Sequence, residues 1–155
     1  MTPPRSLQEL LDIEAIKQLK ADYFYLMDMK QWDEWRELFT EDFTVAGAAV
    51  HEGGRDAFVD FVREHLTGVS SCHAGSMPVI EILGETSARG RWSMRDDLRL
   101  PAGHPWSGAQ PSRRLGYGHY DEEYRREAGA WRISWMRLSR LRVWTLPDDG
   151  ADLRA

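Results

Sequence analysis

Apolar residues recur at steps of three and four between residues 7 and 27, in a stretch without glycine or proline. This spacing predicts a long amphipathic helix. Ser6 and Glu9 have the spacing of a capping box, so the helix is expected to begin there. We expect it to end at Met27 or Asp28, which would leave a carboxylate at its C-terminal end. The apolar positions are Leu7, Leu10, Leu11, Ile16, Leu19, Tyr23, Leu26 and Met27.

Two shorter helices and a strand are predicted next. The aromatic stripe within residues 32–39 indicates a short Trp-rich helix, and residues 42–46 are typical of a first strand. Paired glycines at 53–54 then interrupt the chain. Apolar residues at helical spacing within 58–66 predict a third helix that ends at Gly68.

After Gly68 the period changes to two, which is typical of β-strands. Turns are expected at 84–85 and 128–129, and an interruption of the first long strand is expected near Pro78. Residues 101–112 are rich in Pro, Gly and Ser and predict a surface loop. The predicted strands cover residues 70–83, 86–100, 114–126 and 131–146.

These patterns predict a single α+β domain over residues 1–155, with short flexible tails at about 1–5 and 147–155. Three N-terminal helices would pack on a curved antiparallel sheet, whose twist curls it around the first helix. Such a sheet, closed by helices, forms a cone-shaped barrel with an open mouth that can hold a small apolar ligand.

The composition argues against several classes of protein. The formal net charge is −5 and no basic stripe occurs, which disfavours nucleic acid as the partner. Apolar runs are only a few residues long, so no membrane partner is expected, and no signal peptide is expected at the N-terminus. Cys72 is the single cysteine, which fits a cytoplasmic location. No common metal or nucleotide motif occurs, so we expect neither a metal nor a cofactor.

Motifs spread over residues 7–146 resemble a known family. They are residues 11–20, Tyr23 with Asp28, Trp32-Asp33, Leu38-Phe39, His73, Gly75, Pro78, Gly90-Arg91-Trp92, Tyr120, Tyr124, Gly129, Trp131 and Arg140. The chain resembles the SnoaL-like group of the NTF2-like α+β-barrel superfamily. Within that group it is most similar to bile-acid 7α-dehydratase, which removes water from a steroid nucleus carried as a thioester, and it is also similar to scytalone dehydratase.

The resemblance implies catalytic roles for Tyr23, Asp28, His73 and Arg140, with the tyrosine and aspartate five residues apart as in the dehydratase. It implies a small hydrophobic cyclic substrate, either free or as a coenzyme A thioester. It also implies a homo-oligomer, with a trimer favoured over a dimer.

Two departures from the dehydratase pattern concern the substrate more than the chemistry. Ser76 stands where a second histidine is expected three residues after His73. The loop of residues 100–113 is Pro-rich and carries His104 and Trp106, so the rim of the pocket is expected to differ.

The chemistry of a dehydratase suits an aspartate–histidine pair. A neutral imidazole can take a proton from carbon next to a carbonyl, and a carboxylate on its other nitrogen fixes the tautomer. We expect His73 to be the base, Asp28 to orient it, and Tyr23 to donate to the oxyanion or the departing hydroxyl. Five residues rotate a helix by about 500°, so Tyr23 and Asp28 point roughly 140° apart. Both can face one cavity if the helix loosens near Met27 or the cavity wraps around its end.

Structural roles remain open for these residues. Tyr23 could belong to the core, Asp28 could cap the next helix, and His73 could be structural. Arg140 could lie on a solvated strand face, because alternation places it with Leu138 and Arg142 on one face and Arg137 on the other.

Four further residues are candidates for binding the substrate, namely His119, Trp92, Tyr120 and His104. His119 lies in a Gly-Tyr-Gly-His-Tyr run whose small residues let another segment approach closely. Trp92 could equally be a core residue, and His104 could belong to a lid. We expect His51 and His65 to lie on the surface.

The leading prediction is a cofactor-independent lyase that dehydrates a hydrophobic cyclic substrate of the steroid or polyketide type. An isomerase or polyketide cyclase with the same dyad is the first alternative. A non-catalytic ligand-binding or assembly protein is the second.

Overall fold

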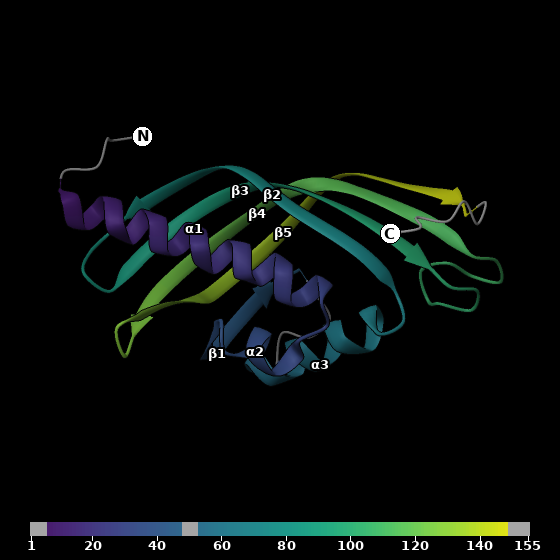
Figure 1. The fold of residues 1–155 in the computed structure, drawn as a ribbon, viewed down its shortest axis with the longest axis horizontal. Coiled ribbons are helices and arrows are strands. Elements are labelled where there is room, and N and C mark those ends of the chain that lie inside the picture. The colour runs from purple at the N-terminus through teal and green to yellow at the C-terminus, as the bar shows by residue number, and fades with distance from the viewer. Residues whose placement is uncertain (1–5, 48–52, 149–155) are drawn as a thin grey trace.

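A computed structural model describes residues 6–47 and 53–148. The predicted N-terminal tail at 1–5, residues 149–155 of the predicted C-terminal tail at 147–155, and His51 lie outside the described residues, whereas Pro147 still belongs to the last strand. Helix α1 (Leu7–Asp28) begins where its capping box predicts, because the Ser6 hydroxyl oxygen accepts from the Glu9 backbone N–H at 3.1 Å, and it ends at Asp28. Figure 1 shows α1 lying across the strands of a long twisted sheet.

The elements that close the sheet follow α1 in sequence. They are α2 (Trp32–Arg36), β1 (Phe39–Ala46) and α3 (Gly54–Leu66). Figure 1 shows them gathered near the C-terminal end of α1. β1 begins at Phe39, earlier than predicted, because Phe39 pairs with Ile133 and its ring is fully buried.

The four predicted long strands are β2 (Ser70–Ile82), β3 (Ser87–Leu100), β4 (Ser112–Glu127) and β5 (Ala130–Pro147). With β1 they form one sheet in the order β1-β5-β4-β3-β2. β2 to β5 pair antiparallel, but β1 pairs with β5 in parallel, so the sheet differs from the purely antiparallel prediction at this edge. The α+β class and the helices packed on a curved sheet match the prediction.

Irregular positions in the sheet bend it and re-aim its side chains. The register of β2 shifts between Ser76 and Val79, where Met77 has φ 46°, as the interruption near Pro78 predicted. β5 carries an extra residue, Leu141, because Gly118 pairs with Arg140 whereas Tyr117 pairs with Arg142. Such a bulge turns the strand and reverses its alternation beyond that point.

One ion pair lies inside the apolar core. Lys20 donates to Glu122, and both side chains are at most 1% exposed. The Lys20 ammonium also lies 3.8 Å from the ring centroids of Tyr23 and Tyr120, within the distance at which a cation is attracted to an aromatic face. Burial lowers the pKa of Lys20, and the charge and hydrogen bond of Glu122 oppose that effect.

Replacing Glu122 by glutamine should lower the free energy of unfolding by about 3–5 kcal/mol, because a buried ammonium then lacks its counter-charge. The double variant Lys20→Met/Glu122→Gln should recover most of this loss. Urea unfolding followed by tryptophan fluorescence measures both. As a control, Glu14→Gln breaks the exposed pair with Lys17 on the same helix and should cost less than about 0.5 kcal/mol. Equal losses for the two single variants would contradict this account of the core.

Candidate active site

An apolar hollow of about 450 Å³ lies between α1, α3 and the inner face of the sheet. α1 contributes Tyr23 and Met27, and α3 contributes aromatic and aliphatic side chains from residues 58–66. The sheet contributes inward side chains of all five strands, among them His73 and Tyr120. The size and the lining suit a small ring-shaped ligand.

His73 and Asp28 meet at the wall of this hollow. The Nδ1 of His73 lies 2.6 Å from Oδ1 of Asp28, and the His73 backbone N–H donates to Oδ2 at 2.7 Å. The Ser71 hydroxyl donates to Oδ1 at 2.8 Å and in turn accepts from Lys30 at 2.6 Å. Because a carboxylate only accepts, Nδ1 carries the proton, and Nε2 of neutral His73 is left as a basic nitrogen turned away from Asp28.

The hydrogen bonds around Asp28 keep it ionised. Burial of the half-buried side chain would raise its pKa, but the hydrogen bonds and charge of His73 and the Ser71 hydroxyl outweigh that effect and lower the pKa. An ionised Asp28 holds the His73 ring in one orientation and can stabilise a proton gained at Nε2.

The rotation between Tyr23 and Asp28 is accommodated without a break in α1. Tyr23 lines the hollow directly, whereas Asp28 at the helix end contacts His73, and His73 lines the hollow. Only one of the two α1 residues therefore needs to face the ligand.

Tyr23 and Tyr120 form the polar part of the hollow's floor. Their ring centroids are 6.0 Å apart and both residues are buried. Burial is the main cause that raises the pKa of each hydroxyl, so both remain neutral donors at physiological pH. The Tyr23 hydroxyl contacts Sδ of Met136 at 3.8 Å, and a thioether is a weak acceptor that a ligand oxygen can replace.

Arg140 reaches the same hollow from β5. Its Nη2 donates to Oδ2 of buried Asp96 at 2.7 Å. Gly116 makes room for this pair, since a Cβ there would lie 2.1 Å from the Arg140 guanidinium and 2.2 Å from Oδ1 of Asp96. The expectation that Arg142 shares this face is wrong, because the bulge at Leu141 pairs Arg142 with the outward Tyr117.

Two of the candidates for substrate binding do not line the hollow. Trp92 is buried in the core, where its Nε1 donates to the Tyr124 hydroxyl at 2.8 Å. His119 pairs with Ser93 and Ser139, and strand alternation places it on the outer face, opposite to Tyr120.

The third such candidate, His104, supports the rim. Its Nε2 lies 2.9 Å from the His65 carbonyl oxygen, and its Nδ1 accepts from the Trp106 backbone N–H at 3.1 Å. The first bond attaches the loop between β3 and β4 to α3, and the second fixes Trp106 within that loop. His104 therefore positions the rim and does not contact the cavity.

Three residues at the rim were not predicted as ligand contacts. His65, expected on the surface, lines the hollow and stacks on Trp106 with ring centroids 4.9 Å apart. Arg114 lines the hollow as well. The aromatic and histidine residues of the loop could have indicated a ligand contact at the rim. The sequence does not show that the loop packs on His65 of α3.

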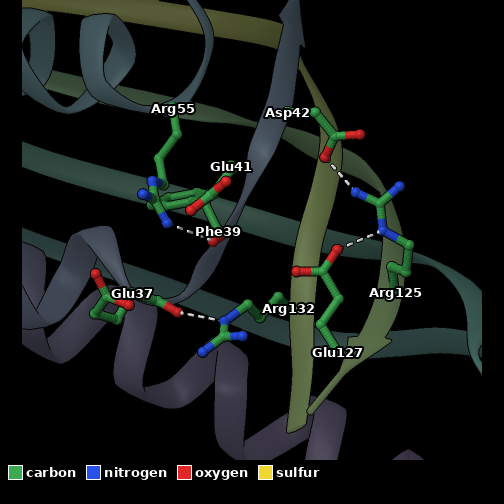
Figure 2. A pocket seen from close by; sticks show the side chains of 8 residues that line it. All are labelled: Glu37, Phe39, Glu41, Asp42, Arg55, Arg125, Glu127 and Arg132. Carbon is green, nitrogen blue, oxygen red and sulfur yellow. Dashed lines mark hydrogen bonds and ion pairs between the residues drawn. The ribbon is translucent and has the colours of Figure 1, made fainter.

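A second hollow of about 590 Å³ lies beside β1 and is lined mainly by charged residues (Figure 2). Its arginines are already engaged by protein atoms. Arg125 bonds to Asp42 and Glu127, and Arg132 donates to the Glu37 carbonyl oxygen at 3.0 Å. Although larger, this hollow offers little apolar surface and no histidine, so the first hollow is the candidate active site.

Residues 6–47 and 53–148 contain neither a metal-binding cluster nor a membrane-spanning helix. In these ranges, no cluster of three or more His, Cys, Asp or Glu side chains has an arrangement that could hold a metal ion. None of the helices there has the length and apolar character needed to cross a bilayer.

A curled sheet closed by helices around a hollow defines the NTF2-like class of α+β barrels, and this fold agrees with it. Within that class the chain belongs to the SnoaL-like domain family, whose model matches residues 8–137.

Solved structures share the fold over most of the chain. A candidate scytalone dehydratase from Novosphingobium aromaticivorans DSM 12444 is 24% identical with a TM-score of 0.76, covering 93% of this chain and 97% of that chain. A type 2 hexachlorocyclohexane dehydrochlorinase is 19% identical with a TM-score of 0.76, covering 90% and 92%. Rv3472 of Mycobacterium tuberculosis, a protein of unknown function, is 26% identical with a TM-score of 0.68, covering 87% and 75%.

The lowered pKa of Asp28 predicts a pH-dependent contribution to stability. The carboxylate stabilises the folded chain above its unfolded pKa, near 3.8, and this contribution is lost as pH falls through the lower folded pKa. The difference in unfolding free energy between wild type and Asp28→Asn should therefore be larger at about pH 6 than at about pH 2. Urea unfolding at both pH values measures it, and a difference that grows on acidification would contradict the assignment.

Proposed function

We propose that the chain is a cofactor-independent lyase that dehydrates a hydrophobic cyclic substrate, with His73 as the general base. The observation that carries this proposal is the 2.6 Å contact between His73 and Asp28 on the wall of an apolar hollow. A charged carboxylate behind an imidazole, with an apolar cavity in front of it, is suited to removing a proton from carbon.

In the first step, Nε2 of His73 takes a proton from the carbon next to the substrate carbonyl. The electron pair of that C–H bond moves toward the carbonyl oxygen and forms an enolate-like species. Asp28 stabilises the imidazolium that results, because its charge lies on the other ring nitrogen. Proton transfer of this kind contributes about 10²- to 10⁴-fold in rate.

Tyr23 supplies the stabilisation of negative charge. Its neutral hydroxyl would exchange the weak contact to Met136 for a hydrogen bond to the developing oxyanion. The Tyr120 hydroxyl, which shares this floor, is a second possible donor. Arg140 adds a positive charge at the wall of the hollow, partly offset by Asp96.

The second step expels the hydroxyl group from the neighbouring carbon. The electron pair returns from the oxyanion to form the new C=C bond, and the C–O bond breaks. The proton held by His73 leaves with the departing hydroxyl as water, which restores neutral His73. The overall reaction is substrate to unsaturated product plus water, with no external oxidant or reductant.

Two kinds of comparison support a lyase. The candidate scytalone dehydratase and the hexachlorocyclohexane dehydrochlorinase are both named for eliminations. The resemblance to bile-acid 7α-dehydratase favours a steroid-type or polyketide-type ring as the substrate. The hollow of about 450 Å³ is large enough for a fused-ring skeleton of this size.

An isomerase or a polyketide cyclase is the second candidate function, because the dyad prepares the same enolate whether or not a hydroxyl leaves. Mass spectrometry of the product separates the alternatives. Dehydration lowers the mass by one water, whereas isomerisation leaves it unchanged.

His73→Ala should reduce kcat by at least about 10²-fold with the fold retained, because the base is removed from a cavity wall. Steady-state kinetics on hydroxylated steroids and polyketides measures the loss, and circular dichroism checks the fold. His119→Ala is the matched control, since His119 lies on the outer face and should leave kcat unchanged. A full-rate His73→Ala variant would contradict the assignment of His73 as the general base.

We also propose a homo-oligomer, with a trimer favoured over a dimer. Large apolar side chains at the outer end of β4 and β5 support it, because Tyr117, Trp144 and Leu146 are each 40–46% exposed. Light scattering should give about three times the chain mass of 17.9 kDa. A strict monomer would contradict the proposal.

A further inference from the structure

Arg114 differs from the other charged residues near the hollow. It lies on β4 with its side chain half-buried in the cavity wall. Within residues 6–47 and 53–148, no carboxylate forms an ion pair with it. Its neighbour Arg113, in contrast, donates to Asp97 through Nε at 2.8 Å and through Nη2. A guanidinium has five N–H donors that can bind an anion, and Arg114 presents them at the cavity wall.

The surroundings hold the Arg114 guanidinium in a defined place. Its Cζ lies 5.0 Å from the centroid of the Trp106 ring, and Trp106 is stacked on His65. The hydrogen bonds of His104 attach the Trp106 segment to α3. A pre-organised guanidinium of this kind loses less conformational entropy when it binds a ligand.

The charges facing the hollow do not balance. Arg114 and Arg140 are the charged side chains among the described lining residues, and no acidic side chain is present there. Asp96 behind the wall bonds to Arg140 through one oxygen only. Its other oxygen, Oδ1, is buried without a hydrogen-bond partner within the described part of the chain. One carboxylate thus serves two cations, and one positive charge remains in an apolar cavity.

This imbalance affects Arg114 itself. Burial lowers its pKa, the neighbouring Arg140 lowers it further, and Asp96 opposes both. The charge of a bound anion would offset both the cost of desolvation and the repulsion from Arg140.

We propose that the substrate carries a carboxylate, which Arg114 binds at the rim while the ring system lies against His73 and Tyr23. The proposal rests on the lyase function above and specifies its substrate as a hydrophobic cyclic acid. A carboxylate is favoured over other anions because it matches the planar fork of a guanidinium with two parallel hydrogen bonds.

The sheet register separates the two ends of such a substrate. His73 pairs with Asp96, whereas Arg114 pairs with Leu98, two residues further along β3 and one strand beyond it. Strand spacing and rise then put the His73 and Arg114 backbones roughly 12 Å apart. The carboxylate would therefore be held away from the reacting carbon, so Arg114 governs binding and not proton transfer.

Binding of 2-naphthoate and of the neutral isostere 2-naphthamide tests the proposal by calorimetry, without any need for turnover. Arg114→Gln should weaken 2-naphthoate binding by at least about tenfold and leave 2-naphthamide unaffected. Arg114→Lys, which keeps the charge but not the fork, should fall between Arg114→Gln and wild type. Arg113→Gln is the matched control, because it removes the same charge from the adjacent, already paired position and should bind as wild type.

Three results would overturn the proposal. The first is equal affinity of wild type and Arg114→Gln for 2-naphthoate. The second is that Arg113→Gln weakens 2-naphthoate binding as much as Arg114→Gln does. The third is displacement of 2-naphthoate by coenzyme A, which would assign Arg114 to a carrier phosphate. His73→Ala removes a contact to the ring and not to the carboxylate, so it should preserve the preference of the wild type for 2-naphthoate over 2-naphthamide. Failure of the proposed lyase function would appear as unchanged turnover by His73→Ala. Failure of the carboxylate proposal would appear in binding, so the two failures are distinguishable.

Discussion

The hydrogen bonds that converge on Asp28 are the constraint on which the site depends. Its two oxygens accept from the His73 ring, the His73 backbone and Ser71, so the end of α1 is tied to β2. Three donors keep the carboxylate charged in a half-buried position, and its charge selects the tautomer of the imidazole. One contact thus fixes the helix on the sheet and prepares a basic nitrogen at the cavity wall.

The inner face of β4 lacks side chains at its middle, which makes room for the charged pair at the cavity wall. Gly116 and Gly118 leave the space that Arg140, Asp96 and the β5 backbone occupy, since a Cβ at Gly118 would lie 2.2 Å from the Ser139 carbonyl oxygen. The bulge at Leu141 lies next to this point in the sheet. Because of it, Arg140 faces inward while Arg142 faces outward. The charge at the wall of the hollow therefore follows from local backbone geometry as much as from residue type.

Periodicity predicted the helices and the long strands well, because α1 and β2 to β5 each keep one hydrophobic period over many residues. It could not predict the contact of Asp28 with His73, which came from family resemblance, since the two residues are far apart in sequence. It also failed where alternation breaks, as at Arg142, and where a charge is buried, as at Lys20, because a lysine in a helix is ordinarily read as exposed. Long-range attachment of the loop to His65 left no periodic signal at all.

The attachment of that loop has a consequence for how the family can diversify. The dyad belongs to α1 and β2, whereas Trp106 belongs to a loop that one imidazole, His104, joins to α3 through the His65 carbonyl oxygen. Insertions and exchanges in such a loop leave the strands beneath it undisturbed. New ligand preferences can therefore evolve by grafting a different rim onto an unaltered reaction centre.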